Sequence, residues 1–390
     1  MKVIHTSDWH IGKRLCGQER LDEQREVLYE IADICDREKA DLVLVAGDVF
    51  DNFLPSAEAE DLFYEAIKKI AGKDRLVLII SGNHDDNVRL AAASAISEEQ
   101  GIYIYGNTAH VPHVAGGRRV HLTEAGVSYA VVSDGKEEIF VNLLPYPNEA
   151  RLREDKNPDE SFQDKMCRWI AAGQGKNVRN LPSIFLSHLF VAGGKVSEGE
   201  REIDLGGARA VPLSLLPGCA YTALGHLHRR QYFKNNVYYS GSILQYAFDE
   251  AGAAKSVVAF DICDGKAENI REIPLTKGRR LVRLESDGAV QAKEVLAMYP
   301  DALIELTLHL REPLLASQVR ELKECSPGLV SIVSDVRTEE QERRGVSRKT
   351  MSSSELFREY YKSIYAEEPA DDLTELFLSL TEDTDETTAS

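Results

Sequence analysis

Aspartate, asparagine and histidine residues stand at the ends of several short apolar runs, where they can do metal or proton chemistry. The first run leads into HTSDWHIG, residues 5–12, in which Asp8 and His10 lie two positions apart. An extended backbone would aim both side chains to one side, with Trp9 pointing the other way into packing. A buried carboxylate or imidazole is costly without partners, so three explanations compete: a local salt bridge, a nucleophile–base pair, or a metal ion.

Four later apolar runs end in the same residue types. In α/β sheets, ligand sites form outside the carboxyl ends of the strands, so side chains at these ends are expected to meet. One buried histidine is more often a satisfied core residue than a ligand, but coincidences at five strand ends favour a common site. The later residues are Asp48 after LVLVAG, Asn83 and His84 after LVLIIS, His188 after SIFLS, and His226 and His228 at the end of YTALG.

The number of possible ligands predicts two metal ions, because it exceeds what one ion needs. Asp48 is the natural bridge between two ions, since Gly47 before it allows a sharp exit from the strand. Oxygen and imidazole ligands without thiolates favour Mn²⁺, Fe²⁺ or Zn²⁺, with Mg²⁺ as a further option. Two such ions can clamp and polarise a phosphate and activate water for in-line attack. The predicted ligands are Asp8, His10, Asp48, Asn83, His188, His226 and His228.

His84 directly follows a predicted ligand, so its ring can reach the site without binding a metal ion. It is a candidate to protonate the leaving oxygen, an effect typically worth about 10²–10⁴-fold in rate. Asp85 beside it can fix the tautomer of the ring and raise its pKa. The alternative for Asp85 is a plain turn residue in GNHDD. Candidate contacts to the phosphates of a substrate are Lys13, Arg14 and Arg89.

Strands and helices alternate over the first 275 residues, which predicts a layered α/β domain with right-handed crossovers. Apolar residues at helical spacing predict helices over 19–40 and 56–72, the second beginning at Ser56 and ending at Gly72. Short aliphatic or β-branched runs closed by Gly, Ser or Pro predict the strands. These strands are expected at 2–7, 41–47, 75–82, 139–146, 183–190, 221–226, 235–248 and 256–263.

The pattern restarts after residue 275. Residues 276–338 read as a small β-α-β-α-β module, and the polar residues 339–353 as a linker. Residues 354–390 hold two short amphipathic helices and an acidic tail. These helices either pack on the protein's own core or insert into a groove on a partner, a mode that suits aromatic-rich helices beyond a linker. The residues singled out for partner binding are Leu356, Phe357, Tyr360, Tyr361, Leu376 and Phe377.

Bulk properties limit the function classes. The chain is 43% hydrophobic and 28% charged, as expected of a soluble globular protein, and no apolar run is long enough for a membrane helix. Because MKVIHTSDWH also lacks the features of a signal peptide, a cytoplasmic location is expected. The net charge of −18 argues against a large electrostatic footprint for nucleic acid, although residues 366–390 carry half of that excess.

Several other chemistries are excluded by missing motifs. The six cysteines are scattered singly, so they form neither a zinc site nor a disulfide framework. No G-x-S-x-G elbow occurs, and no G-x-x-x-x-G-K-[ST] loop occurs either. The chain is therefore not expected to bind a nucleotide through a P-loop.

The motifs DWH, GDVFD, GNHD, SHLF and GHLH stand in the order and approximate spacing of the calcineurin-like metallophosphoesterases. The chain resembles that family, and its whole length resembles the family's bacterial DNA nucleases. The resemblance implies a sandwich of two sheets flanked by helices, with a small α+β capping domain and C-terminal helices. It also implies a homodimer, Mn²⁺-dependent cleavage of DNA ends and hairpins, and a partner ATPase with a coiled coil that binds the C-terminal helices.

The resemblance further implies two ligand sets and a catalytic histidine. His84 matches the catalytic histidine, with Asp85 as its companion, and Asp51 stands where archaeal and eukaryotic relatives tend to have a histidine. Two rival functions remain: a phosphatase or cyclic-nucleotide phosphodiesterase that uses the same metals, and a metal-free scaffold. The implied ligands are Asp8, His10, Asp48 and His228 for one ion, and Asp48, Asn83, His188 and His226 for the other.

Overall fold

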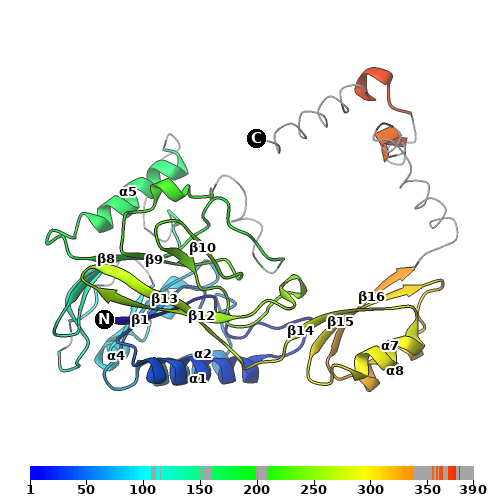
Figure 1. The fold of residues 1–390 in the computed structure, drawn as a ribbon, viewed down its shortest axis with the longest axis horizontal. Coiled ribbons are helices and arrows are strands. Elements are labelled where there is room, and N and C mark those ends of the chain that lie inside the picture. The colour runs from blue at the N-terminus through cyan, green and yellow to red at the C-terminus, as the bar shows by residue number, and fades with distance from the viewer. Residues whose placement is uncertain are drawn as a thin grey trace. The chain divides into compact units, whose positions relative to one another are not determined.

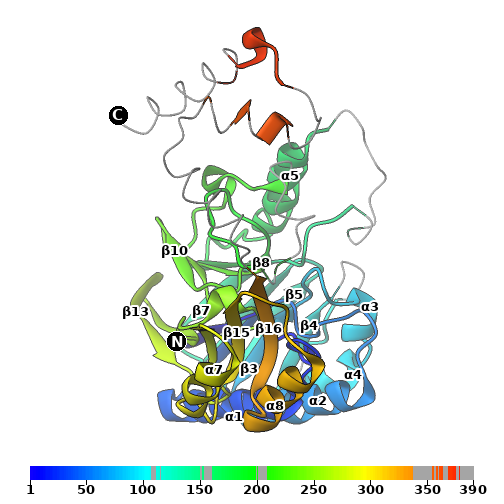
Figure 2. The same ribbon diagram turned by 90° about the vertical axis from the view of Figure 1, so that its right-hand side faces the viewer.

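The structure is a computed structural model of the 390-residue chain (Figures 1 and 2). It divides into two compact units, one of residues 1–284, 299–305 and 327–331, and one of the remaining residues after 284. The residues described are 1–106, 111–114, 116–149, 152, 160–198, 200, 209–336, 354, 357–358, 360–362, 368–374 and 377.

The first sheet has six strands in the order β13-β12-β1-β2-β3-β4. Strands β1 to β4 are parallel, and their register pairs Val3 with Leu42 and Leu42 with Leu76, so their carboxyl ends lie at one edge. The predicted ligands Asp8, Asp48 and Asn83 follow β1, β2 and β3 at this edge. The strands are β1 Lys2–Thr6, β2 Leu42–Ala46, β3 Leu76–Ile80, β4 Ile102–Tyr105, β12 Ser256–Cys263 and β13 Lys266–Pro274.

The second sheet has seven strands in the order β10-β11-β9-β8-β7-β6-β5. Its central strands β7, β8, β9 and β11 are parallel, so the residues that follow β8 and β9 also share an edge. The strands are β5 His121–Gly126, β6 Tyr129–Ser133, β7 Glu138–Leu144, β8 Ser183–His188, β9 Tyr221–Gly225, β10 Gln231–Phe233 and β11 Val237–Tyr239.

Helices cover the outer faces of both sheets, and the inner faces pack on each other. One apolar core joins the two sheets, a second joins the first sheet to α1 Leu21–Glu38 and α2 Ala57–Ala71, and a third joins the second sheet to α5 Phe162–Gln174. Figure 1 shows α1 and α2 along one side of the sandwich and α5 on the opposite side. The two-sheet sandwich that the resemblance implies is confirmed. The shorter helices are α3 Asn87–Leu90, α4 Ser94–Ser97, η1 Glu98–Gln100, η3 Leu213–Leu215 and η4 Phe248–Glu250.

The chain after residue 280 forms the predicted succession of β, α, β, α and β elements. They form a three-stranded sheet, in the order β14-β15-β16, and two helices. The elements are β14 Leu281–Ser286, α7 Ala289–Ala297, β15 Leu303–Leu310, α8 Ala316–Cys325 and β16 Leu329–Val336. The predicted linker 339–353 lies outside the described residues. None of the described helices is long and apolar enough to cross a membrane.

The sequence patterns misjudged one strand and missed others. Of the predicted strand 235–248, only β11 is extended, because Ser240, Gly241 and Ser242 turn back toward the loop after β9. Gly241 adopts a positive φ of 79°, which a strand does not use. The strands β4, β5, β6, β10 and β13 and the helix α5 were not predicted.

Candidate metal centre

The candidate ligands follow β1, β2 and β3 of one sheet and β8 and β9 of the other, and the structure brings all of them together. Three glycines let these strand ends approach each other. A Cβ on Gly47 would lie 2.5 Å from His188 Nδ1, one on Gly82 would lie 2.1 Å from Asp48 Oδ1, and one on Gly225 would lie 1.9 Å from the Ala46 carbonyl oxygen. Real Cβ contacts are never that short, so this edge of the sandwich requires glycine at all three positions.

The backbone around Asp8 and His10 is not extended, which corrects the expectation from their spacing. The two residues have φ values of 51° and 44°, and Asp48 has a φ of 50°, all in the left-handed region that ordinary residues avoid. Hydrogen bonds to the loop after β2 hold this conformation: Asp8 N donates to Gly47 O at 3.1 Å, and His10 N donates to Asp48 O at 3.0 Å. Strained backbone of this kind concentrates at functional sites.

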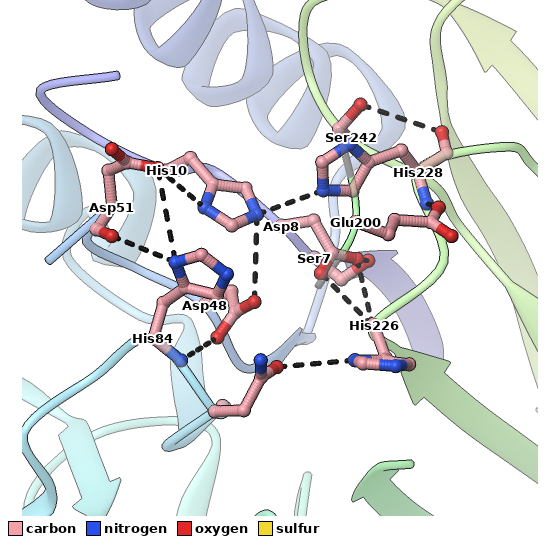
Figure 3. Close-up of polar contacts among 12 residues, drawn as sticks. Ser7, Asp8, His10, Asp48, Asp51, His84, Glu200, His226, His228 and Ser242 are labelled. Atoms are coloured by element: carbon pink, nitrogen blue, oxygen red, sulfur yellow. Dashed lines mark hydrogen bonds and ion pairs between the residues drawn. The ribbon is translucent and has the colours of Figure 1, made fainter. Parts of the chain in front are cut away.

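One group of donor atoms surrounds His10, as Figure 3 shows. The Nε2 atoms of His10 and His228 lie 3.0 Å apart, and His10 Nε2 lies 3.5 Å from Asp48 Oδ2. Asp8, His10 and His228 each offer one donor atom within 4.8 Å of the others. These four residues are the set that the resemblance implies for one ion.

A second group of donor atoms surrounds Asn83. Its Oδ1 lies 2.8 Å from His188 Nε2 and 3.2 Å from His226 Nδ1. His188 Nε2 also lies 3.4 Å from Asp48 Oδ2. Since the same Asp48 oxygen is 3.5 Å from His10 Nε2, it stands between the two groups, in the position that a bridging ligand would take.

Burial and neighbouring charges shift the pKa values of these side chains. Burial lowers the pKa of His10 and His226 to about 3, so both rings are neutral and can act as ligands. Burial raises the pKa of Asp8 to about 8. For Asp48 burial is outweighed by nearby imidazoles, which hold its pKa well below the usual value, and for His188 it is outweighed by Asp48 and Asp8, which raise the pKa to about 9. A bound cation would replace the protons that this site now shares.

The residues present fit divalent metal ions. All donor atoms are oxygen or imidazole nitrogen, and none is a thiolate. His188 Nδ1 donates to the Ala46 carbonyl oxygen at 2.8 Å, so Nε2 is the nitrogen that faces the site and would bind a metal ion once its proton is displaced. The Nδ1 atoms of His10 and His228 face the carboxylates of Asp51 at 3.4 Å and Glu250 at 3.5 Å, so the Nε2 atom of each ring is directed to the site.

His84 lies beside the two groups, with its ring edge against His10 at a centroid distance of 4.7 Å. Its main-chain N–H donates to Asp48 Oδ1 at 2.8 Å. Its ring Nδ1 lies 2.8 Å from the main-chain oxygen of Asp51, so Nδ1 carries a proton and Nε2 is the nitrogen left for chemistry. The donor atoms of His84, His10 and Asp48 also lie within 4.8 Å of one another.

Asp85 contacts the backbone of the two loops that carry Asp48 and His84. Its carboxylate accepts hydrogen bonds from the main-chain N–H groups of Gly82 at 2.8 Å, Phe50 at 2.9 Å and Val49 at 3.2 Å. Burial and the nearby Asp48 raise its pKa to about 6. Asp85 therefore ties the loop after β3 to the loop after β2, and the Asp51 carbonyl is the group that orients His84.

Three charged residues that sequence reasoning missed surround His228. The main-chain N–H of His228 donates to Glu200 Oε1 at 2.6 Å, and the main-chain oxygen of His228 accepts from Lys255 Nζ at 2.9 Å. Its ring Nδ1 lies 3.5 Å from Glu250 Oε1, and Glu250 in turn pairs with Lys255. Each of these partners lies 22 to 28 positions away in a segment without a motif, so no sequence signal marked them.

The three predicted phosphate contacts are all paired with carboxylates. Lys13 lies 2.9 Å from Asp51, Arg14 pairs with Glu19, and Arg89 lies 3.0 Å from Glu60. Of these three cations, Lys13 alone contacts a residue of the site.

Comparison with known proteins shows the family to which the chain belongs. Residues 1–230 match the calcineurin-like phosphoesterases. The chain is 33% identical to the SbcD component of the nuclease SbcCD from Bacillus subtilis (strain 168) over 398 positions, which cover 97% of each protein. It is 35% identical to the SbcD component of the same nuclease from Rhodobacter capsulatus over 312 positions, 76% of this chain and 75% of that one. Among solved structures it resembles a dimetal phosphatase from Danio rerio, with 10% identity, a TM-score of 0.41, and coverage of 71% of this chain and 99% of that one.

The chain therefore belongs to the calcineurin-like phosphoesterase family, whose members are metal-dependent phosphoester hydrolases. Within that family, it resembles the SbcD component of the nuclease SbcCD, over 97% of its length in the case of the Bacillus subtilis protein.

Proposed function

We propose that this chain is a Mn²⁺-dependent DNA nuclease, with 3′→5′ double-strand exonuclease activity and endonuclease activity on single strands and hairpins. In this proposal it works with an SbcC-type ATPase in DNA end processing, repair, recombination and replication. The names of its relatives and the oxygen and imidazole donor set support the proposal. The observation that carries it is the position of Asp48 Oδ2, within 3.5 Å of a histidine nitrogen in each ligand group.

The proposed chemistry assigns each residue a task. Asp8, His10, Asp48 and His228 hold one divalent ion, and Asp48, Asn83, His188 and His226 hold the other. When bound, the two ions supply charge that polarises the phosphodiester and activates water. In its imidazolium form His84 donates the proton on Nε2 to the departing oxygen and keeps the proton on Nδ1, which is hydrogen-bonded to the Asp51 carbonyl and holds the ring in the required orientation. Asp85 acts as a positioning residue that fixes the two loops on which Asp48 and His84 stand.

We place the partner-binding surface in the C-terminal segment. Its described residues 354, 357–358, 360–362, 371–374 and 377 are helical. Phe357 and Phe377 stack with centroids 4.3 Å apart, and Arg358 pairs with Asp371 at 2.7 Å, so the two predicted helices contact each other. Tyr360 is 61% exposed and Tyr361 is partly exposed, which leaves aromatic surface for a partner. Leu356 and Leu376, also predicted to bind the partner, lie outside the described residues.

Two further features belong to the proposal. The nuclease works as a homodimer, and it acts in the cytoplasm at the nucleoid, where its substrate lies. The domain boundaries at residues 275, 338 and 353 are also proposed, with the module 276–338 acting as a cap over the substrate.

One assay tests the proposed function. The purified chain is incubated with hairpin DNA and Mn²⁺, with and without an SbcC-type ATPase and ATP. We expect cleavage of the hairpin with Mn²⁺ alone and faster cleavage with the ATPase and ATP. Hydrolysis of cyclic nucleotides or phosphoproteins without any cleavage of DNA would instead establish the rival phosphodiesterase or phosphatase activity.

A further inference from the structure

A cavity of about 530 Å³ adjoins His228 on the side where β10, β12 and β13 contribute residues. We call it the Arg229 cavity. Four of its lining side chains are cationic and one is a carboxylate. Three of these cations have carboxylate partners: Arg229 pairs with Asp249, Arg230 with Glu272 and Lys255 with Glu250. The exposed Lys195 and the donors of the two guanidinium groups that these pairs leave over are the groups that suit an anionic ligand. The charged lining residues are Lys195, Arg229, Arg230, Lys255 and Glu272.

The cations of this cavity are held in place by specific contacts. Arg229 Nε donates to Ser197 Oγ at 3.1 Å, and its Nη2 lies 3.0 Å from Asp249 Oδ2. The N–H of Lys195 donates to Gln231 Oε1 at 2.8 Å, and its carbonyl accepts from Gln231 Nε2 at 2.9 Å, so the backbone of Lys195 is fixed while its side chain is exposed. These contacts occupy part of each Arg and leave further N–H donors for a ligand.

The cavity is connected to the candidate metal centre through His228. Arg229 and Arg230 directly follow His228, and Lys255 both lines the cavity and donates to the His228 carbonyl oxygen at 2.9 Å. Any group bound among these cations therefore lies next to a residue that faces the metal site.

We propose that the Arg229 cavity binds a backbone phosphate of the nucleic-acid strand that is being cleaved, at a position other than the scissile one. The inference rests on the proposed nuclease function, because it assigns a second contact to the same substrate. Phosphate contacts of this kind fix the register of a strand without reading its sequence, so the cavity contributes to DNA affinity uniformly across sequences.

The test compares a long and a short substrate on a double variant, Lys195→Gln with Arg230→Gln. The measured quantities are kcat/KM for hairpin DNA and for bis(p-nitrophenyl) phosphate, a diester too small to span both sites, and the salt dependence of KM for DNA. We expect the loss in kcat/KM for DNA to exceed the loss for the small diester by about tenfold. The salt slope for DNA should fall by about 1, because the cavity is proposed to neutralise one phosphate.

Two further variants make the test specific. Arg271→Gln is the matched control, because Arg271 is also a partly exposed arginine in an ion pair, with Glu38, and does not line the cavity. Its kcat/KM for both substrates and its salt slope should equal those of the unsubstituted protein. Glu272→Gln removes the carboxylate that pairs with Arg230, and it should lower KM for DNA by freeing that guanidinium.

The outcomes separate this inference from the proposed function. If the unsubstituted protein hydrolyses the small diester with Mn²⁺ but leaves DNA intact, the nuclease proposal fails. If it cleaves DNA, and the double variant matches Arg271→Gln in both kcat/KM and salt slope, the Arg229 cavity does not bind the strand. Melting curves of each variant establish that it is folded, and the opposite sign expected for Glu272→Gln cannot arise from unfolding.

Discussion

The Nδ1 atom of His84 lies 2.8 Å from the main-chain carbonyl oxygen of Asp51. A carbonyl oxygen only accepts hydrogen bonds, so this contact fixes the proton on Nδ1 and directs Nε2 toward the centre of the site. The Asp51 side chain contributes too, since its carboxylate lies 3.4 Å from His10 Nδ1 and 2.9 Å from Lys13 Nζ. Asp51 therefore contacts both His84, the proposed proton donor, and His10, a member of one proposed metal-ligand group.

His84→Gln should lower kcat for DNA cleavage by about 10²–10⁴-fold, because it removes the proposed proton donor. Metal binding should persist, since His84 belongs to neither proposed ligand set. Metal content by mass spectrometry and single-turnover cleavage rates measure the two effects separately. The control is His121→Gln, which changes a histidine on β5 outside the site. Cleavage at an undiminished rate would remove His84 from the mechanism.

Glu250→Gln should weaken metal binding at the His10 and His228 group by about 10–100-fold, because the carboxylate beside His228 Nδ1 no longer supports the ring. The second ligand group does not contact Glu250, so its ion should stay. Titration calorimetry with Mn²⁺ should then resolve one tight and one weakened site. Glu149→Gln, which removes the carboxylate partner of the buried Lys165, is the control. Equal weakening of both sites would contradict the assignment.

Gly47→Ala should destabilise the fold strongly, because its Cβ would meet His188 Nδ1 at 2.5 Å and the Gly82 backbone at 2.8 Å. Gly135→Ala is a matched control, since both glycines have a φ of 85° and nothing lies within 4 Å of the new Cβ at Gly135. The backbone penalty of about 1–2 kcal/mol is therefore common to both variants. Urea unfolding should show a greater loss of stability for Gly47→Ala, and equal losses would mean that the strand ends are not closely packed.

The metal-free protein should lose stability on acidification, in part through His5. Burial lowers the folded-state pKa of His5 from 6.5 to about 3, so below pH 6.5 the unfolded chain binds a proton that the folded chain does not. Its contribution is fully present above pH 6.5 and falls by about 1.4 kcal/mol per pH unit as the pH drops toward 3.

His5→Gln measures this contribution, because glutamine does not titrate and can still hydrogen-bond to Tyr221, whose hydroxyl lies 3.1 Å from His5 Nδ1. The free energy of unfolding from urea titrations, plotted between pH 7 and pH 5, should have a shallower slope for the variant than for the unsubstituted protein. Identical slopes would show that His5 titrates normally in the folded protein.

Truncation after Thr350 should leave Mn²⁺-dependent nuclease activity and remove its stimulation by the SbcC-type ATPase and ATP. The reason is that the proposed partner surface, with Phe357 stacked on Phe377, is lost while the metal centre is retained. Co-purification and ATP-dependent cleavage rates check the expectation. Full assembly of the truncated chain with the ATPase would place the partner surface elsewhere.

The sequence by itself determined which residues stand at the ends of the strands. The apolar runs before Asp8, Asp48, Asn83, His188 and His226 are local signals, since alternating buried strands and amphipathic helices can be recognised without knowing what they pack against. Parallel strands then place their carboxyl ends at one edge of each sheet, so the convergence of these residues within a sheet followed from pattern. The meeting of the two edges depends on how the two sheets pack on each other. The β-α-β-α-β succession after residue 280 was legible for the same reason.

Only the tertiary structure decided how these residues are held. The left-handed φ of Asp8 and His10 comes from hydrogen bonds to the loop after β2, about 40 positions away, and local propensity opposes it. The contacts of Asp51, Glu200, Glu250 and Lys255 depend on which loops face each other, and no periodic pattern records that. Side-chain orientation at a buried polar site is set by the sum of long-range hydrogen bonds, so the ligands could be predicted from sequence while their supports required the fold.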